Sequence, residues 1–443
     1  MSAASRATAT GRAAVLAGGW LAIAAVAARA QPIDPARPST IVIGVPAGAR
    51  TDRVDTSRTG LSQTPLPSSA LHVEWRASTG APLEHAPLVD ARGSTYVVSA
   101  RGEAIAIARD GTERWRAPTG AADPGAAALL SDDTLVVVDA AGEAIGLRDG
   151  VVRWRSHVGV ADAAGPGPLP LDDGGLVVAT AHDLALLDAQ GHERARTVLP
   201  ESPAGPLLWA LGKVVVVAAS GSVWTWTPGT AEPSRVASFG SPVTGGAALA
   251  GEHTLVAVVA GQTSLASIDL LRGGRAGVPR ALAPGGVWLG PPTLRGEAAT
   301  LAVLGPASEI AVTVDGSGRE LGRALLAGRL PASRADGGAP ATGGLSAPLL
   351  VDLGGTIAFA TFEGAVGVAA SGGTSAIAVE TLDDACPRSS GLQGVFGGAP
   401  SPVAGLAPLP PGSFVVACHS GTLVAIEGAA GASTGGKMRP STL

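Results

Sequence analysis

The sequence is poor in the residues and patterns that usually build an enzyme site. It has only two cysteines and seven histidines, and no two histidines stand at the HxH or HxxxH spacing of metal ligands. Apart from the stretch Gly-Ala-Ser-Thr-Gly at 431–435, in the expected disordered tail, no Gly-x-Ser-x-Gly turn occurs, and a Walker loop, a GxGxxG segment before a helix and the alternating carboxylates of an EF-hand are missing. These absences argue against hydrolase, nucleotide-binding and calcium-loop functions. They predict no catalytic residue, no metal site and no cofactor.

Charge is scarce as well. Charged residues make up 15% of the chain against 46% hydrophobic residues, which is enough to form a large core. The formal net charge is -5, and the first 30 residues contain three arginines and no acid, so the rest of the chain is more acidic still. A mildly acidic chain without a basic stripe is a poor candidate for binding nucleic acid or an anionic lipid surface.

The one long apolar run lies near the N-terminus. Residues 13–27 follow Arg6 and Arg12 and lead to Ala28-Arg29-Ala30, which fits the small-x-small cleavage rule. The run of about 15 residues contains Gly18-Gly19 and is short for a membrane span. We expect residues 1–30 to be a cleaved signal peptide, the alternative being an N-terminal helical anchor.

Cleavage would leave a mature chain in the periplasm or outside the cell. No cysteine follows the apolar run, so a lipidated N-terminus is not expected. No later segment reaches membrane-spanning length without Gly, Pro or charge, which predicts no membrane insertion after cleavage.

A period near 40 residues organises most of the chain. Its clearest anchors are Trp75, Trp115 and Trp154, each followed by an arginine and spaced 40 and 39 residues apart. Later copies lose the tryptophan. The expected equivalents of the anchor are Ala195, Val236, Ala281 and Gly322.

Each period holds four short apolar runs separated by Gly-containing turns. The second and third runs occur eight times, and the second runs are rich in Val without alternation, as expected for strands covered on both faces. A small four-stranded sheet cannot bury two apolar faces by itself, but sheets stacked around an axis can. We therefore predict an all-β fold, with a single eight-bladed β-propeller of four-stranded blades over residues 71–428. The last unit lacks a fourth run, so the N-terminal strand Leu71–Ser78 is expected to complete it.

The Asp-Gly turns before the anchors and the Ala-Pro-Leu-x-Asp run after the first one resemble pyrroloquinoline-quinone-type propeller repeats. These repeats occur in quinoprotein dehydrogenases and in BamB-type propellers of outer-membrane assembly. The segment 55–60, Asp-Thr-Ser-Arg-Thr-Gly, also resembles the stretch that often precedes the first blade of such proteins. The resemblance covers roughly residues 55–428 and implies a fold whose members differ widely in function.

The resemblance raises one enzyme hypothesis, a quinone-dependent dehydrogenase. Such enzymes hold their cofactor in the ring axis beneath a disulfide between adjacent cysteines, whereas Cys386 and Cys418 stand 32 residues apart. The expected inner strands offer mostly Ala, Gly, Pro and Leu. The preferred prediction is therefore an exported, non-catalytic scaffold for protein interaction or ligand binding in the cell envelope, monomeric and with a protein partner; the quinone-dependent enzyme is the alternative.

The flanks and insertions complete the predicted organisation. Residues 31–70 are expected to form a Pro-rich extended segment, ordered where residues 55–60 meet the ring, and residues 429–443 a disordered tail. In an oxidising compartment Cys386 and Cys418 could form a disulfide that links an insertion to the last blade. Two insertions, 328–344 and 383–398, precede inner strands and should emerge on the same face. The charged residues predicted to contact a partner there are Arg329, Arg334, Asp336, Asp383, Asp384 and Arg388.

Overall fold

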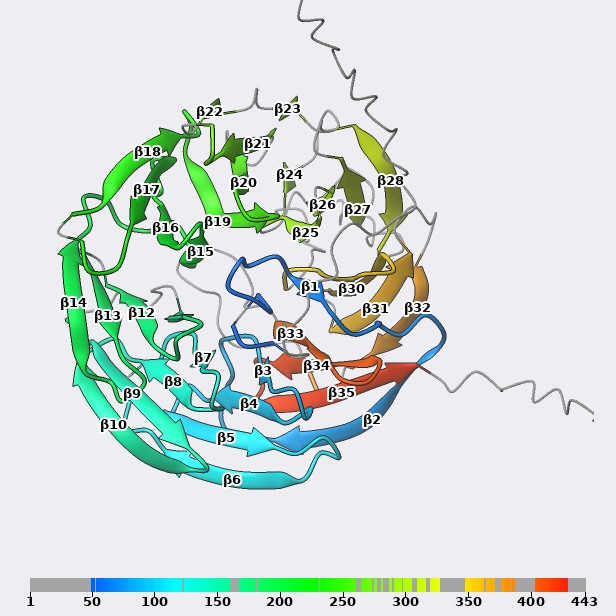
Figure 1. Ribbon diagram of the computed structural model, residues 1–443. Coiled ribbons are helices and arrows are strands. Elements are labelled where there is room, and N and C mark those ends of the chain that lie inside the picture. The colour runs from blue at the N-terminus through cyan, green and yellow to red at the C-terminus, as the bar shows by residue number, and fades with distance from the viewer. Residues whose placement is uncertain are drawn as a thin grey trace, which may run out of the picture. The chain divides into compact units, whose positions relative to one another are not determined.

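A computed structural model gives the fold of the chain. It describes residues 49–428 apart from 52, 122, 160–166, 181, 231, 260–263, 273–274, 277–279, 282–286, 289–290, 297, 305–308, 316–318, 327–346, 362–363, 371–375, 383 and 387–402. All of these belong to one compact unit, Pro46–Leu443. Every regular element in the described ranges is a β-strand, and the strands form eight small sheets arranged in a ring (Figure 1). The predicted all-β, eight-bladed propeller is confirmed.

The first four blades follow one another along the chain, each with four antiparallel strands running from the axis to the rim. Blade 1 contains β3 (Leu88–Val89), β4 (Thr95–Val98), β5 (Glu103–Ile107) and β6 (Glu113–Pro118). Blade 2 contains β7 (Ala128–Leu129), β8 (Leu135–Val138), β9 (Glu143–Arg148) and β10 (Val151–His157). Blade 3 contains β11 (Leu169–Pro170), β12 (Leu176–Ala179), β13 (Asp183–Leu187) and β14 (Glu193–Val198). Blade 4 contains β15 (Leu208–Ala210), β16 (Lys213–Val217), β17 (Ser222–Trp226) and β18 (Ser234–Ser238).

The last four blades are less regular. Blade 5 contains β19 (Val243–Ala250), β20 (Thr254–Val259), β21 (Ser264–Asp269), β22 (Arg275–Ala276) and β23 (Arg280–Ala281). Blade 6 contains β24 (Val287–Trp288), β25 (Thr293–Arg295), β26 (Ala298–Leu304), β27 (Glu309–Val314) and β28 (Glu320–Leu325). Blade 7 contains β29 (Leu350–Asp352), β30 (Thr356–Ala360), β31 (Ala365–Ala370) and β32 (Ala376–Thr381), and β1 (Leu61–Ser62) pairs with β29 in parallel.

Blade 8 closes the ring with strands from both ends of the propeller. Its inner three strands are β33 (Val403–Leu409), β34 (Ser413–Cys418) and β35 (Thr422–Gly428), and its outer strand is β2 (Leu71–Ser78). β2 pairs with β35 in antiparallel register from Leu71 opposite Gly428 to Ser78 opposite Thr422. The predicted closure of the last blade by this N-terminal strand is confirmed. The backbone hydrogen bonds between β2 and β35 close the last blade and remove one exposed sheet edge.

The hydrophobic core is divided among the interfaces between neighbouring blades. Blades 1 and 2, for example, share a cluster that includes Leu88, Tyr96, Leu129 and Leu135. Separate clusters follow between blades 2 and 3, 3 and 4, 4 and 5, 5 and 6, and 6 and 7, and the largest joins blades 7, 8 and 1. The second strands of blades 1 to 4, 7 and 8 are buried over nearly all of their residues, which explains the unbroken Val-rich runs.

Two details differ from the expected strand lengths and positions. The inner strands of blades 1 to 3 are only two residues long, and in blades 1 and 3 proline, which cannot donate to a ladder, occurs in or next to them. In blade 5 the fourth strand is split into β22 and β23, and Ala281 pairs with Ser264 at the start of β21. Trp115, in contrast, pairs with Ala106, the fourth residue of β5. Ala281 therefore does not occupy the anchor position, whereas Gly322, opposite Thr313, does.

Candidate functional site

The axis of the propeller is occupied by the chain itself. Residues 49–66, here called the lead-in segment, run among the inner strands at the centre of the ring before the chain reaches the rim as β2 (Figure 1). The segment contacts the inner edge of each of the first seven blades in turn. Its hydrogen bonds link Ala49 and Val89 in both directions, Leu129 N to Arg50 O, Arg58 Nη2 to Pro168 O, Trp209 N to Thr56 O, Leu249 N to Ser57 O, Leu294 N to Thr59 O and Val351 N to Gly60 O.

Two arginines and one aspartate of this segment are held deep in the ring. Arg58 is 1% exposed, and its guanidinium donates to the carbonyls of Leu207 (3.1 Å) and Pro168 (3.3 Å). Arg53 donates to the Pro292 carbonyl at 2.7 Å. Asp55 accepts from the backbone N–H of Thr59 (3.0 Å) and from its hydroxyl (2.5 Å). The arginine bonds fix the segment to blades that lie more than 100 residues away in the sequence.

Burial affects the charge of Asp55. Desolvation raises the pKa of its carboxyl above 3.8, although the Thr59 bonds and the nearby Arg58 and Arg53 act in the opposite direction. The lead-in segment therefore brings both signs of charge into the axis. Its arginines donate to backbone carbonyls of the blades, and its aspartate accepts from the backbone N–H and the hydroxyl of Thr59.

The three anchor tryptophans lie at the seams between blades. Each indole on an outer strand packs against the glycine of the Asp-Gly or Gln-Gly turn of the next blade. A Cβ atom on that glycine would lie 2.7 Å from Trp75 at Gly111, 3.2 Å from Trp115 at Gly150 and 2.4 Å from Trp154 at Gly191. A Cβ atom would clash with the tryptophan at Gly111 and Gly191 and would need a small shift at Gly150, and all three residues have positive φ, so the repeated Trp and Gly of the sequence are two halves of one inter-blade junction.

A second inter-blade contact comes from the arginine that follows the anchor. Arg116 donates to the Thr79 carbonyl at 2.7 Å, Arg155 to the Thr119 carbonyl at 2.5 Å and Arg196 to the Val158 carbonyl at 2.8 Å. Each carbonyl belongs to the connection that leaves the preceding blade. Each arginine also pairs with an acid at the start of its neighbouring third strand, namely Glu103, Glu143 or Asp183. Reasoning from the sequence missed this junction, although the repeated Trp-Arg and Ala-Arg pairs were its signal.

The two cysteines form a disulfide in the structure. Cys386 follows β32 of blade 7 and Cys418 ends β34 of blade 8, with Cα atoms 5.1 Å apart and both residues buried. Ser420 Oγ donates to the Ala385 carbonyl at 2.7 Å beside it. Covalent and hydrogen-bond links therefore join the connection after blade 7 to blade 8, far from the adjacent-cysteine arrangement of quinoprotein dehydrogenases.

The loops predicted to bind a partner lie mostly outside the described residues. Of the six charged residues only Asp384 is described, in the exposed turn that follows β32. Arg329, Arg334, Asp336, Asp383 and Arg388 fall in ranges that are not described. Their partner-contact role stays a prediction.

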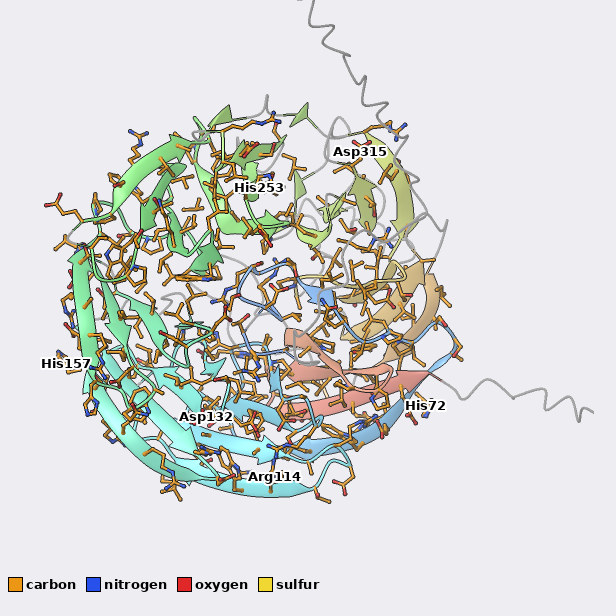
Figure 2. All side chains as sticks on the ribbon, in the orientation of Figure 1. His72, Arg114, Asp132, His157, His253 and Asp315 are labelled. Carbon is orange, nitrogen blue, oxygen red and sulfur yellow. A yellow bond between two sulfur atoms is a disulfide. The ribbon has the colours of Figure 1, made fainter. Side chains whose placement is uncertain are left out.

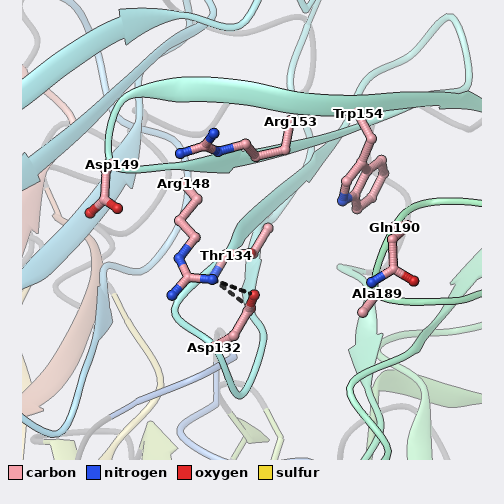
Figure 3. Close-up of a pocket in the computed structure, with 8 residues that line it drawn as sticks. All are labelled: Asp132, Thr134, Arg148, Asp149, Arg153, Trp154, Ala189 and Gln190. Carbon is pink, nitrogen blue, oxygen red and sulfur yellow. Dashed lines mark hydrogen bonds and ion pairs between the residues drawn. The ribbon is translucent and has the colours of Figure 1, made fainter.

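One surface groove of about 450 Å³ opens at the seam between blades 2 and 3 (Figure 3). Its walls come from the first and third inter-strand turns of blade 2, the start of β10 and the third turn of blade 3. The lining residues are Asp132, Thr134, Arg148, Asp149, Arg153, Trp154, Ala189 and Gln190. Arg148 pairs with Asp132 at 3.1 Å across one wall, and Ala189 and Gln190 form the opposite wall. The indole nitrogen of Trp154 is buried without a hydrogen-bond partner.

The histidines and acids of the described ranges do not form a metal site. His72, His157 and His253 lie far apart around the ring (Figure 2), and His72 contacts Glu427 at 2.7 Å on the surface. Over those same ranges no group of three or more His, Cys, Asp or Glu side chains is arranged to hold an ion. No helix in this part of the chain is long and apolar enough to cross a membrane.

The ring of eight four-stranded sheets, the Trp–Gly seams and the closing N-terminal strand define a propeller built from pyrroloquinoline-quinone-type repeats. Residues 72–289 match the family model described as outer membrane protein assembly factor BamB. The resemblance predicted from the repeat is confirmed. The search of the curated proteins found no match.

Solved structures share the fold at low sequence identity. BamB from Moraxella catarrhalis is 17% identical with a TM-score of 0.56, and the match covers 82% of this chain and 99% of that one. Quinohemoprotein alcohol dehydrogenase from Comamonas testosteroni is 11% identical with a TM-score of 0.61, covering 87% and 81%. The computationally designed Ika8 protein is 14% identical with a TM-score of 0.59, covering 80% and 99%. These likenesses establish the architecture and not the activity, because one fold hosts both assembly factors and dehydrogenases.

Proposed function

We propose that the chain is an exported, monomeric and non-catalytic propeller that binds partner proteins in the cell envelope. The observation that carries this proposal is the path of the lead-in segment. Its backbone and its two buried arginines occupy the axis, bonded to seven blades, where a quinone-dependent relative would hold its cofactor. A cofactor could enter there only by displacing bonded, buried backbone and guanidinium groups, which is costly.

The family match supports the same role. Its name describes an assembly factor for outer membrane proteins, and the matched residues 72–289 include the intact seams of blades 8 to 3. We infer that this chain acts in protein assembly or maintenance at the envelope by presenting a rigid surface. The alternative, a quinone-dependent dehydrogenase, is favoured only by likeness to solved structures at 11% identity.

A reconstitution experiment separates the two functions. The purified full-length chain is incubated with pyrroloquinoline quinone and calcium, and absorbance and alcohol-dependent dye reduction are recorded beside a known quinoprotein dehydrogenase. We expect no stable quinone spectrum and no dye reduction from this chain. Stoichiometric quinone uptake with alcohol-dependent turnover would overturn the proposal.

Partner binding needs its own measurement. Cross-linking in the native host, followed by purification of the chain and mass spectrometry, should recover envelope proteins. The matched sample is a strain whose chain lacks residues 1–30, in which export and recovery of these partners should both be lost. Recovery of the same proteins from both strains would contradict the proposal.

A further inference from the structure

Two equivalent seams of the ring, between blades 8 and 1 and between blades 2 and 3, carry different side chains, and the difference creates the groove. At the seam between blades 8 and 1, the side chain of Arg109 fills the space in front of Trp75. Its guanidinium contacts Glu74 Oε2 at 2.6 Å, the Pro410 carbonyl at 2.7 Å and Ser413 Oγ at 3.0 Å. This filled space is here called the seam slot.

The strand register identifies the matching residues at the seam between blades 2 and 3. Arg109 stands two residues before Gly111, which packs on Trp75, and Ala189 stands two residues before Gly191, which packs on Trp154. Alanine cannot cross the slot, so the slot is empty there and forms the groove. The residues that match Glu74 and Ser413 are Arg153 and Thr134, both of which line the groove.

The charge of the slot is reversed between the two seams. Glu74, which receives a guanidinium at the filled seam, is replaced by Arg153 at the open one. Arg153 is exposed and has no ion pair or hydrogen bond within the described part of the chain. A guanidinium in the open slot would find no carboxylate equivalent to Glu74 and would be repelled by the positive charge of Arg153. A carboxylate in the same place would accept charge-assisted hydrogen bonds from Arg153.

The other charges of the groove leave room for an anion. Arg148 neutralises Asp132 at 3.1 Å. Asp149 is the remaining acid, and Figure 3 shows its carboxylate on the far side of Arg148 from Ala189 and Gln190. The Thr134 hydroxyl makes no bond to the residues that the structure describes and, like Ser413 Oγ in the filled slot, is placed to contact a polar group.

We propose that the open seam slot between blades 2 and 3 is a recognition site for a carboxylate, presented by a Glu or Asp side chain of a partner protein. Arg153 and the Thr134 hydroxyl are its donors. This inference rests on the proposed scaffold function and names the chemistry of one contact. A free dicarboxylic acid would satisfy the same donors, so the experiment includes one.

The test measures binding of a fluorescein-labelled polyglutamate peptide to the full-length chain by fluorescence anisotropy at low salt, beside polyglutamine and polyarginine. Binding of polyglutamate alone is expected. Arg153→Glu should weaken it about tenfold, the effect of one charge-assisted hydrogen bond. Ala189→Arg, which fills the slot from within as Arg109 does, should weaken it similarly. Arg194→Glu makes the same charge change one blade further on, where Arg194 already pairs with Asp188, and should leave binding unchanged.

Three outcomes decide the matter. Weaker polyglutamate binding in Arg153→Glu and Ala189→Arg, but not in Arg194→Glu, supports the site. The double variant Arg153→Glu/Ala189→Arg restores the ion pair of the filled seam, and its stability checks that the weaker binding is not caused by misfolding. Saturation by glutarate with the same pattern assigns the slot to a free acid instead of a side chain. Polyglutamate binding that is absent, or equal in all variants, overturns the site; if cross-linking still recovers partners, the scaffold function survives.

Discussion

Single residues decide how neighbouring blades meet. The anchor tryptophans are large, and each needs a facing glycine because the turn backbone lies directly on the ring. The same principle explains Gly146, opposite Trp154, where a Cβ atom would lie 2.2 Å from the indole, although alanine stands opposite Trp75 and Trp115. The indole of Trp154 therefore lies closer to the neighbouring strand of its own blade than a Cβ atom would allow.

Replacing one of these glycines should destabilise the ring more than the backbone conformation alone requires. Gly111 and Gly80 both have positive φ, +85° and +77°, but a Cβ atom on Gly111 would meet Trp75, whereas one on Gly80 would have no atom within 4 Å. Gly80→Ala should cost about 1 kcal/mol through φ alone. Gly111→Ala should cost about 2 kcal/mol more through overpacking. Urea unfolding followed by tryptophan fluorescence measures both losses in the free energy of unfolding. Equal losses in the two variants would show that the indole of Trp75 can move aside for a Cβ atom.

At the scale of the element, the lead-in segment has the most unusual role. Its one strand, β1, has only two residues, yet the segment contacts seven blades. It occupies the axis, where Arg53 and Arg58 donate buried hydrogen bonds to backbone carbonyls and Asp55 accepts from Thr59.

Stability should depend on pH through Asp55 with a definite sign. Burial raises its pKa in the folded chain above the ordinary 3.8, so the folded state holds this proton more tightly. The resulting stabilisation is complete below the ordinary pKa and is lost as pH rises through the folded value. The free energy of unfolding of the wild type, relative to Asp55→Asn, should therefore fall as pH rises from about 4.

Asp110 provides the opposite control. Hydrogen bonds from the Thr112 hydroxyl and backbone N–H lower its pKa, so its contribution is present at neutral pH and is lost as pH falls through the folded value. Relative to Asp110→Asn, the wild type should gain stability as pH rises. Denaturant unfolding at a series of pH values gives both slopes, and slopes of the same sign would contradict the assignment.

At the scale of the whole molecule, closure is concentrated at blades 7 and 8. β2 completes blade 8, the largest hydrophobic cluster joins blades 7, 8 and 1, and the disulfide ties the connection after blade 7 to β34. Blades 5 and 6, which precede this region in the ring, are less regular: the outer strand of blade 5 is split, and neither blade has an anchor tryptophan. Covalent reinforcement thus lies where the two ends of the propeller meet.

Reducing the disulfide should loosen this closure. The bond spans 32 residues, and a loop of that length restricts the unfolded chain by about 3 kcal/mol. A reductant should lower the unfolding midpoint of the wild type. The double variant Cys386→Ala/Cys418→Ala should start at the lower midpoint and show no response to reductant. Two free thiols by titration in the exported, unreduced protein would disprove the bond.

The blade count and the closing strand could be predicted because they depend on local patterns. The 40-residue period predicts where strands begin and end, together with the Val-rich runs and the Gly turns. The missing fourth run in the last unit predicts which strand completes the ring. Without tryptophan the spacing still located the anchor position at Ala195 and Gly322. After Val236 the register depends on bulges and a split strand, so Ala281 was placed wrongly.

The sequence by itself determined the repeated fold, because every blade except the closing one is specified by residues within about 40 positions of one another. Only the tertiary structure decided the path of the lead-in segment, the arginine junctions and the open seam slot. These features join residues far apart in the chain, such as Arg53 and Pro292, and no local pattern records which distant carbonyl a guanidinium will meet. The open slot is also a difference between two equivalent seams, Arg109 at one and Ala189 at the other, and its meaning became visible only when the register aligned them.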